Sequence, residues 1–192
     1  AVKHNPGITF DWVVDESFSE VPHWHPNVNK TITTAHRRWR KSIIASWKNG
    51  EFTSFRKALN AEDYDLIIDL QSNLKSAFVS WLSRGSVDGY DAKSCREKPA
   101  HWAYGNTYSV ALYQHAISRQ RELLSKALKY PLPKSAPDYG ANIPRQLTSK
   151  IELPDQYVVF VHNASWETKL WPIQSWQALA RRAAEFGYSV LL

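Results

Sequence analysis

The chain has 192 residues, of which 43% are hydrophobic and 22% are charged, and it carries a net charge of +6. This balance excludes a disordered chain, and the length is enough for one domain and part of another. No apolar run approaches the roughly 20 residues that a membrane-spanning helix needs, and the single cysteine, Cys95, excludes an intrachain disulfide and favours a reducing compartment.

Strands and helices alternate along the first part of the chain. In chain order, the patterns predict a strand at 8–14, a strand at 31–34, a helix at 52–61, a buried strand at 64–70, a helix from 74 to the glycine at 85, and a helix at 107–129. This order is typical of an α/β layer fold with a largely parallel sheet.

The later part of the chain has more prolines and a less regular hydrophobic pattern. Residues 131–155 contain several prolines and show little hydrophobic periodicity. This pattern predicts a linker. Beyond it we expect a strand at 157–162, a loop, a helix at 172–186 and another strand from 189. We therefore predict an N-terminal α/β domain (1–130), a linker (131–155) and the start of a second Rossmann-like domain (156–192). Two such domains indicate a GT-B arrangement, in which substrates bind between two Rossmann-like halves.

The positive charge is concentrated in residues 30–57, which hold eight basic side chains and one acidic one, a net charge of +7. Within it, the sequence of residues 35–41 places arginines and a lysine around Trp39. Guanidinium groups bind carboxylates and phosphates in bidentate fashion, and Trp39 could offer a face for stacking on a sugar. A solvated basic loop and a nucleic-acid site are the alternatives.

The second candidate site is residues 69–76, which follow the strand at 64–70 and open a helix. Open α/β sheets bind ligands at this edge, and helix N-termini present free N–H groups to anions, with Lys75 adding a positive charge. Ordinary capping by Ser72 or Asn73 is the alternative.

The third candidate is the loop at 163–172. It combines the hydroxyl of Ser165, the ammonium of Lys169 and a helix N-terminus at Pro172, a combination that suits a diphosphate leaving group. A generic strand-to-helix loop is the alternative. Among the histidines, His115 reads as structural or surface-exposed, and His23 and His25 have too few neighbouring ligands for a metal site.

Six segments of the sequence, taken in order, resemble the lipopolysaccharide heptosyltransferase I family, which belongs to glycosyltransferase family 9. The matching segments are 7–16, 37–41, 64–71, 74–77, 114–116 and 162–172.

The resemblance implies an inverting GT-B glycosyltransferase that needs no metal ion or cofactor. Such an enzyme transfers L-glycero-D-manno-heptose from ADP-heptose to the Kdo of Kdo2-lipid A in lipopolysaccharide inner-core biosynthesis. It implies a cytoplasmic protein, peripheral on the inner-membrane surface, with no nucleic-acid partner. The alternatives are a heptosyltransferase II that acts on a heptose acceptor, and a non-enzymatic anion-binding or nucleic-acid-binding module.

The resemblance also implies roles for particular residues. Lys169 and Ser165 are expected to contact the donor diphosphate, with Lys169 stabilising the leaving group; Ala164 stands where the family usually has a second hydroxyl. The catalytic aspartate is expected upstream of Ala1 and the adenine-binding half beyond Leu192, so these 192 residues alone are expected to be inactive. The residues expected to bind the acceptor are Arg37, Arg40, Lys41, Lys75, Arg96 and His115.

Overall fold

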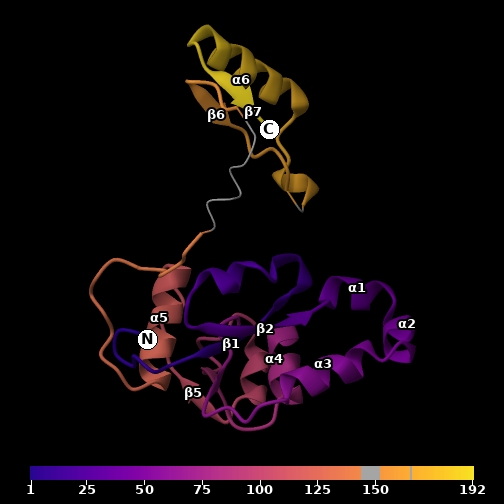
Figure 1. Ribbon diagram of the computed structural model, residues 1–192, viewed down its shortest axis with the longest axis vertical. Coiled ribbons are helices and arrows are strands. Elements are labelled where there is room, and N and C mark those ends of the chain that lie inside the picture. Colours follow the sequence, from indigo (N-terminus) through magenta and orange to yellow (C-terminus); the bar gives the residue numbers. More distant parts are fainter. Residues whose placement is uncertain (144–151, 165) are drawn as a thin grey trace. The chain divides into compact units, whose positions relative to one another are not determined.

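The computed structural model describes residues 1–143, 152–164 and 166–192 (Figure 1). Contacts within the chain divide it into two compact units, Ala1–Ile143 and Pro144–Leu192. The strands that contain Ile67 and Val159 belong to different sheets, one in each unit.

All the described strands pair in parallel, as the alternation of strands and helices predicts. The first unit has a pair β1-β2 and a three-stranded sheet β3-β4-β5, and the second unit has the pair β6-β7. Parallel strands place their carboxyl ends at one edge of each sheet. The strands are β1 (Phe10–Asp15), β2 (Val28–Thr34), β3 (Ile67–Ile68), β4 (Val87–Tyr90), β5 (Asn106–Tyr108), β6 (Tyr157–Val159) and β7 (Ser189–Leu191).

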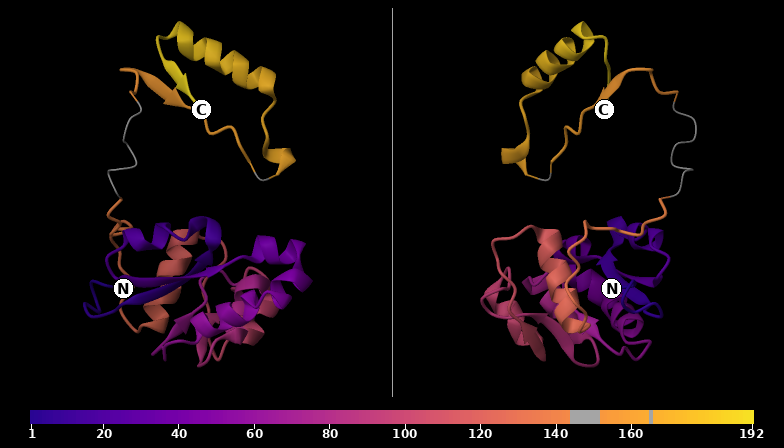
Figure 2. Two further views of the ribbon diagram at one scale, coloured as in Figure 1. Left: turned by 45° about the vertical axis from the view of Figure 1, so that its right-hand side comes forward. Right: turned by 90° about the vertical axis from the view of Figure 1, so that its left-hand side faces the viewer.

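Helices connect these strands, and both views of Figure 2 show α6 lying along the β6-β7 pair. The described helices are all too short or too polar to cross a bilayer. The α-helices are α1 (His36–Lys41), α2 (Ile43–Lys48), α3 (Glu51–Leu59), α4 (Leu74–Leu82), α5 (Ala116–Ala127) and α6 (Ile173–Glu185). The 3-10 turns are η1 (Glu16–Phe18), η2 (Val21–Trp24), η3 (Lys98–Ala103) and η5 (Glu167–Lys169).

Helix α4 joins the two hydrophobic clusters of the first unit. Ala77 belongs to the cluster around Leu123 of α5, whereas Val79 belongs to the cluster that holds Trp39 and Phe55. Residues two apart on a helix point in different directions, so one helix packs against both clusters. The position of α4, and of the loop before it, is therefore fixed from two sides.

The helix predicted at 107–129 begins later than the sequence pattern suggests. Residues 106–108 form strand β5, and the helix starts only at Ala116. The buried carboxylate of Asp88 in β4 accepts hydrogen bonds from the side chains of Asn106, at 2.9 Å, and Tyr108, at 2.8 Å. These contacts across the sheet override the local helical spacing.

Part of the predicted linker, 131–155, contacts the rest of the first unit. The guanidinium of Arg121 donates to the carbonyls of Pro133, at 3.2 Å, and Ser135, at 2.9 Å. Further along, the N–H of Asn142 donates to the carbonyl of Trp24 at 2.6 Å. Residues 131–143 thus pack on the first unit, where the sequence pattern predicted a linker.

Candidate functional site

The basic segment of the sequence forms helix α1. Arg37, Arg40 and Lys41 stand three and four positions apart, so they share one face of the helix. All three are exposed, and none forms an ion pair within the described residues. This face therefore presents three cations that are available to an anionic ligand.

Arg38 and Trp39, in the same helix, have structural roles. The guanidinium of Arg38 pairs with Glu16, at 3.0 Å, and with Glu51, and hydrogen bonds to these two carboxylates raise the pKa of Arg38. Trp39 is 6% exposed, donates from Nε1 to Glu51 at 2.8 Å, and packs 4.7 Å from the ring of Phe52. The hypothesis that Trp39 stacks on a sugar is therefore wrong.

A buried aspartate shapes the turn after β3. One oxygen of Asp69 accepts the N–H groups of Gln71, at 2.8 Å, and Ser72, at 3.1 Å, and the other accepts the hydroxyl of Tyr104 at 2.7 Å. Burial, together with the charge of Asp69, raises the pKa of Tyr104 far above its usual range, so the phenol remains a donor. The sequence analysis missed Tyr104, because it lies 35 positions away and no local pattern connects the two.

The same turn joins the start of α4 to the loop after β4. The hydroxyl of Ser72 accepts the N–H of Arg96 at 3.0 Å, and the carboxylate of Glu97 accepts the N–H of Leu74 at 2.9 Å. Lys75, the second residue of α4, and Arg96 are therefore held on adjoining segments, and both side chains are exposed. The structure brings together two residues that stand 21 positions apart in the sequence.

The charge of Lys75 also acts on the start of α1. Burial lowers the pKa of His36, the first residue of α1, and the positive charge of Lys75 lowers it further against the opposing charge of Asp15. The alternative interpretation of this turn, ordinary helix capping, is also observed. Asn73 caps α4 by accepting the N–H of Ser76 at 2.9 Å. Capping uses Asn73 and leaves Lys75 available.

His115 precedes α5 instead of lying within a helix. Its Nδ1 accepts the N–H of Ile117 at 3.3 Å, so it caps α5, and the ring is exposed. Arg119 of the same helix donates to the carbonyl of Ser94, two residues before Arg96. The segments that carry Lys75, Arg96 and His115 follow β3, β4 and β5, so they leave one edge of the parallel sheet.

Lys169 belongs to the second unit, on the connection between β6 and α6. It ends the turn η5, with its N–H donating to the carbonyl of Trp166 at 2.9 Å, and its side chain is exposed. Helix α6 begins at Ile173 with Pro172 as the preceding cap, within one residue of the predicted start. Ser165 lies outside the described residues.

No group of three or more His, Cys, Asp or Glu side chains that could hold a metal ion occurs in the described parts of the chain. The positive charges at the candidate positions of both units come mainly from lysine and arginine. Their chemistry suits carboxylate and phosphate ligands.

Comparison with known proteins shows which family the chain belongs to. The model of glycosyltransferase family 9 (heptosyltransferase) matches residues 52–192, which is most of the chain. The chain belongs to glycosyltransferase family 9. The family that the sequence segments resemble is thereby confirmed.

Two relatives in family 9 are both named lipopolysaccharide heptosyltransferase 1. The protein of Pseudomonas aeruginosa is 45% identical over 193 aligned residues, covering 100% of this chain and 54% of the relative. The protein of Escherichia coli K12 is 39% identical over 188 residues, covering 97% of this chain and 59% of the relative. The chain thus spans little more than half the length of these relatives.

Solved structures of Escherichia coli heptosyltransferase WaaC share the fold. The structure with ADP matches with a TM-score of 0.86 and 37% identity, covering 99% of this chain and 59% of that one. The structure with ADP-2-deoxy-2-fluoro heptose matches with a TM-score of 0.84 over 98% of this chain and 60% of that one. The predicted fold class, an α/β fold of the GT-B type, is confirmed.

Proposed function

We propose that the complete protein transfers L-glycero-D-manno-heptose from ADP-heptose to the Kdo of Kdo2-lipid A, as an inverting glycosyltransferase of the lipopolysaccharide inner core. The observation that carries this proposal is the exposed face of α1, where three cations have no acidic partner among the described residues. Membership of family 9 and the names of the relatives support the same reaction.

The acceptor contacts follow from the distribution of charge. Glu16 and Glu51 pair with Arg38, so the surplus charge of α1 rests on Arg37, Arg40 and Lys41. Guanidinium groups bind carboxylates and phosphates in bidentate geometry, and a Kdo sugar supplies a carboxylate. An acidic acceptor therefore fits this face better than the uncharged heptose on which a heptosyltransferase II would act. Lys75, Arg96 and His115 extend the acceptor site.

The donor contacts come from the second unit. Lys169 lies four residues before the first residue of α6, whose N-terminal N–H groups favour an anion. As the bond between the sugar and the diphosphate breaks, negative charge grows on the departing ADP, and a fixed ammonium stabilises it. Ser165 would donate a hydrogen bond to the same diphosphate. These charges would let the reaction run without a metal ion.

The transfer would then be a single displacement. A Kdo hydroxyl loses its proton to a general base, which the family resemblance assigns to an aspartate upstream of Ala1, and its oxygen attacks the anomeric carbon of the heptose. The bond from that carbon to the diphosphate oxygen breaks as ADP leaves from the opposite face, so the configuration inverts. We further propose that the protein works in the cytoplasm as a peripheral protein of the inner membrane, because its acceptor is a lipid.

Steady-state transfer kinetics with the complete protein would test this proposal. Arg37→Ala or Arg40→Ala should raise the KM for Kdo2-lipid A by about tenfold and leave the KM for ADP-heptose nearly unchanged, because a bidentate acceptor contact is lost. Lys134→Ala removes another exposed cation, on the segment after α5, and serves as the control. An unchanged acceptor KM in both arginine variants would contradict the proposal and favour the alternative, a solvated basic segment that does not bind the acceptor.

A further inference from the structure

Five large apolar side chains stand exposed on helices α2 and α4, and we refer to them as the aromatic surface. Their exposed fractions range from 43% to 73%. None belongs to either buried cluster of the first unit. Contiguous apolar surface of this kind marks a site of interaction. The residues are Ile43, Ile44, Trp47, Phe78 and Trp81.

Four of these side chains, together with Phe52 of α3, form one surface across three helices, and Ile44 follows Ile43 on α2. A shallow groove of about 410 Å³ is lined by Ile43 and Trp47 of α2, Phe52 of α3 and Phe78 of α4. The ring of Trp81 lies 6.4 Å from that of Phe78, which extends the surface along α4. Sequence positions more than thirty residues apart are thus gathered at one place.

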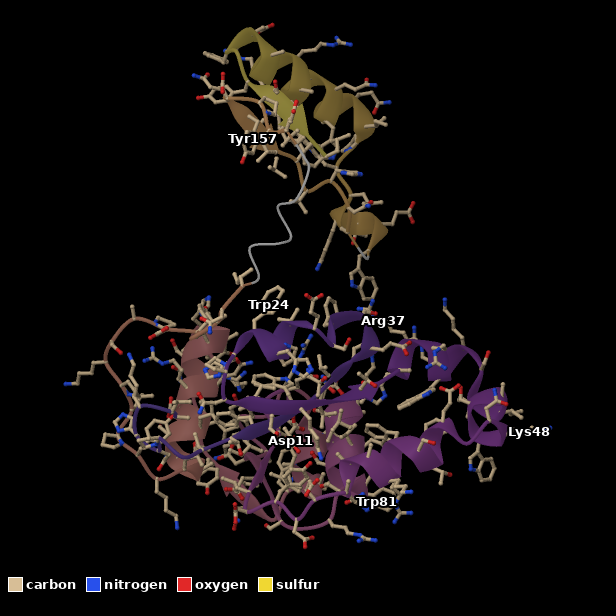
Figure 3. The ribbon with its side chains drawn as sticks, in the orientation of Figure 1. Asp11, Trp24, Arg37, Lys48, Trp81 and Tyr157 are labelled. Atoms are coloured by element: carbon tan, nitrogen blue, oxygen red, sulfur yellow. The ribbon has the colours of Figure 1, made fainter. Side chains whose placement is uncertain are left out.

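Unpaired cations accompany the aromatic surface. Lys48, Arg56 and Lys57 are exposed on α2 and α3, and none forms an ion pair within the described residues. Arg56 also lines the groove. The only acidic residue between positions 30 and 57 is Glu51, which pairs with Arg38. Figure 3 labels Lys48 at the end of α2 and Trp81 on α4.

We infer that the aromatic surface, with Lys48, Arg56 and Lys57, docks on an anionic phospholipid bilayer. Tryptophan and isoleucine side chains enter the boundary between headgroups and acyl chains, while lysine and arginine meet the anionic headgroups. Stable attachment without a spanning helix requires both kinds of contact, and this surface supplies both.

The positive charge of α2 and α3 favours an anionic bilayer, and not a second copy of the chain, as the partner of the aromatic surface. Two copies paired through this surface would bring the cations of α2 and α3 of each close to those of the other, and the acidic residue of these two helices, Glu51, already pairs with Arg38. A bilayer offers apolar depth and negative charge at once. The inference rests on the proposed function for its purpose, which is to bring the α1 face to a lipid-linked acceptor, but binding is measured without either substrate.

Vesicle sedimentation of the full-length protein would test this assignment. We expect binding to phosphatidylcholine vesicles that contain about one third phosphatidylglycerol, weak binding to phosphatidylcholine alone, and release as salt is raised. Trp47→Ala and Trp81→Ala should each lower the partition coefficient about tenfold. Trp166→Ala, in the second unit and 67% exposed, is the matched control and should have no effect.

Charge reversal provides a second measurement. Lys48→Glu and Arg56→Glu should weaken binding to the anionic vesicles only, whereas Lys134→Glu, on the segment after α5, should not. All these side chains are exposed, and circular dichroism would verify folding. Transfer to an acceptor dispersed in detergent separates the two proposals: loss of transfer with intact vesicle binding counts against the proposed function alone.

Two outcomes would overturn the inference. One is unchanged binding to anionic vesicles in both tryptophan variants. The other is a change of mass in sedimentation velocity on Trp47→Ala, with vesicle binding intact, which would make the aromatic surface a contact between copies or with another protein.

Discussion

Gly89 lies in β4 against the ring of Tyr104, the residue that donates to Asp69. A Cβ atom added at Gly89 would meet Cδ2 of that ring at 2.3 Å, which is far inside contact distance. The ring is buried, so it cannot swing into solvent. The absence of a side chain at Gly89 therefore allows the hydrogen bond that shapes the turn before α4.

Gly89→Ala should destabilise the protein by about 1 to 3 kcal/mol, because the phenol of Tyr104 must move or the strand must shift. Gly7→Ala is the control, since an added Cβ there meets nothing within 4 Å. Urea unfolding followed by circular dichroism measures both. Equal midpoints for Gly89→Ala and the parent would show that the ring can relocate without cost.

Lys169 is the residue on which the proposed chemistry depends most. For Lys169→Ala in the complete enzyme we expect kcat to fall by roughly 10²-fold or more with a smaller change in donor KM, because the charge on the leaving ADP develops mainly in the transition state. Lys169→Arg should restore little, because a planar guanidinium places its charge differently from a compact ammonium. Near-normal kcat in the alanine variant would leave Lys169 as an ordinary surface lysine.

At the scale of elements, the charge of Lys75 at the start of α4 acts on His36 at the start of α1. Burial and the charge of Lys75 both favour the neutral imidazole, and they lower the pKa of His36 from its ordinary value of 6.5. The unfolded chain then takes up a proton before the folded one does. The contribution of His36 to stability is therefore full above about pH 6.5 and is lost as the pH falls through its lowered folded value.

Lys75→Met should raise the pKa of His36 toward 6.5, since one repulsive charge disappears while burial remains. NMR titration of the imidazole measures this directly, with Lys134→Met as the control. The same variant should flatten part of the fall in stability at acidic pH. An unmoved pKa in Lys75→Met would mean that α4 does not present this lysine to α1.

At the scale of the molecule, the positive charge is segregated. Residues 30–57 carry +7 in a chain of net charge +6, so the remainder is slightly acidic. A protein that binds nucleic acid through phosphates alone loses affinity steeply with salt. Carboxylate recognition by paired guanidinium groups depends on geometry as well as charge.

Titration of the complete protein with Kdo2-lipid A, heparin and duplex DNA at several salt concentrations distinguishes a site for the Kdo2-lipid A acceptor from a nucleic-acid-binding site. We expect Kdo2-lipid A to remain bound near physiological salt, where DNA and heparin have dissociated. Tighter binding of DNA than of Kdo2-lipid A under those conditions would favour the nucleic-acid module that the basic segment alone also allows.

Much of this protein could be predicted from the sequence by itself. The sequence predicted strands β1, β2, β3, β6 and β7, the start of α6 near Pro172 and the family, because these depend on local patterns: hydrophobic periodicity, residues typical of helix ends, and short motifs that stand in order along the chain. It did not predict β4 or β5. The basic segment at 35–41 could also be proposed as an anion site from its charge, with a solvated loop and a nucleic-acid site as alternatives. These features are local because a few neighbouring residues suffice to specify them.

Only the tertiary structure decided which of those residues are free to act. Arg38 is neutralised by a glutamate 22 positions earlier, and Trp39 is covered by α3, so both leave the candidate site. Strand β5 has three residues and replaces a predicted helical turn because its side chains satisfy the buried carboxylate of Asp88. The partners in each case are distant in sequence, and a buried charge must find its hydrogen bonds wherever the fold supplies them.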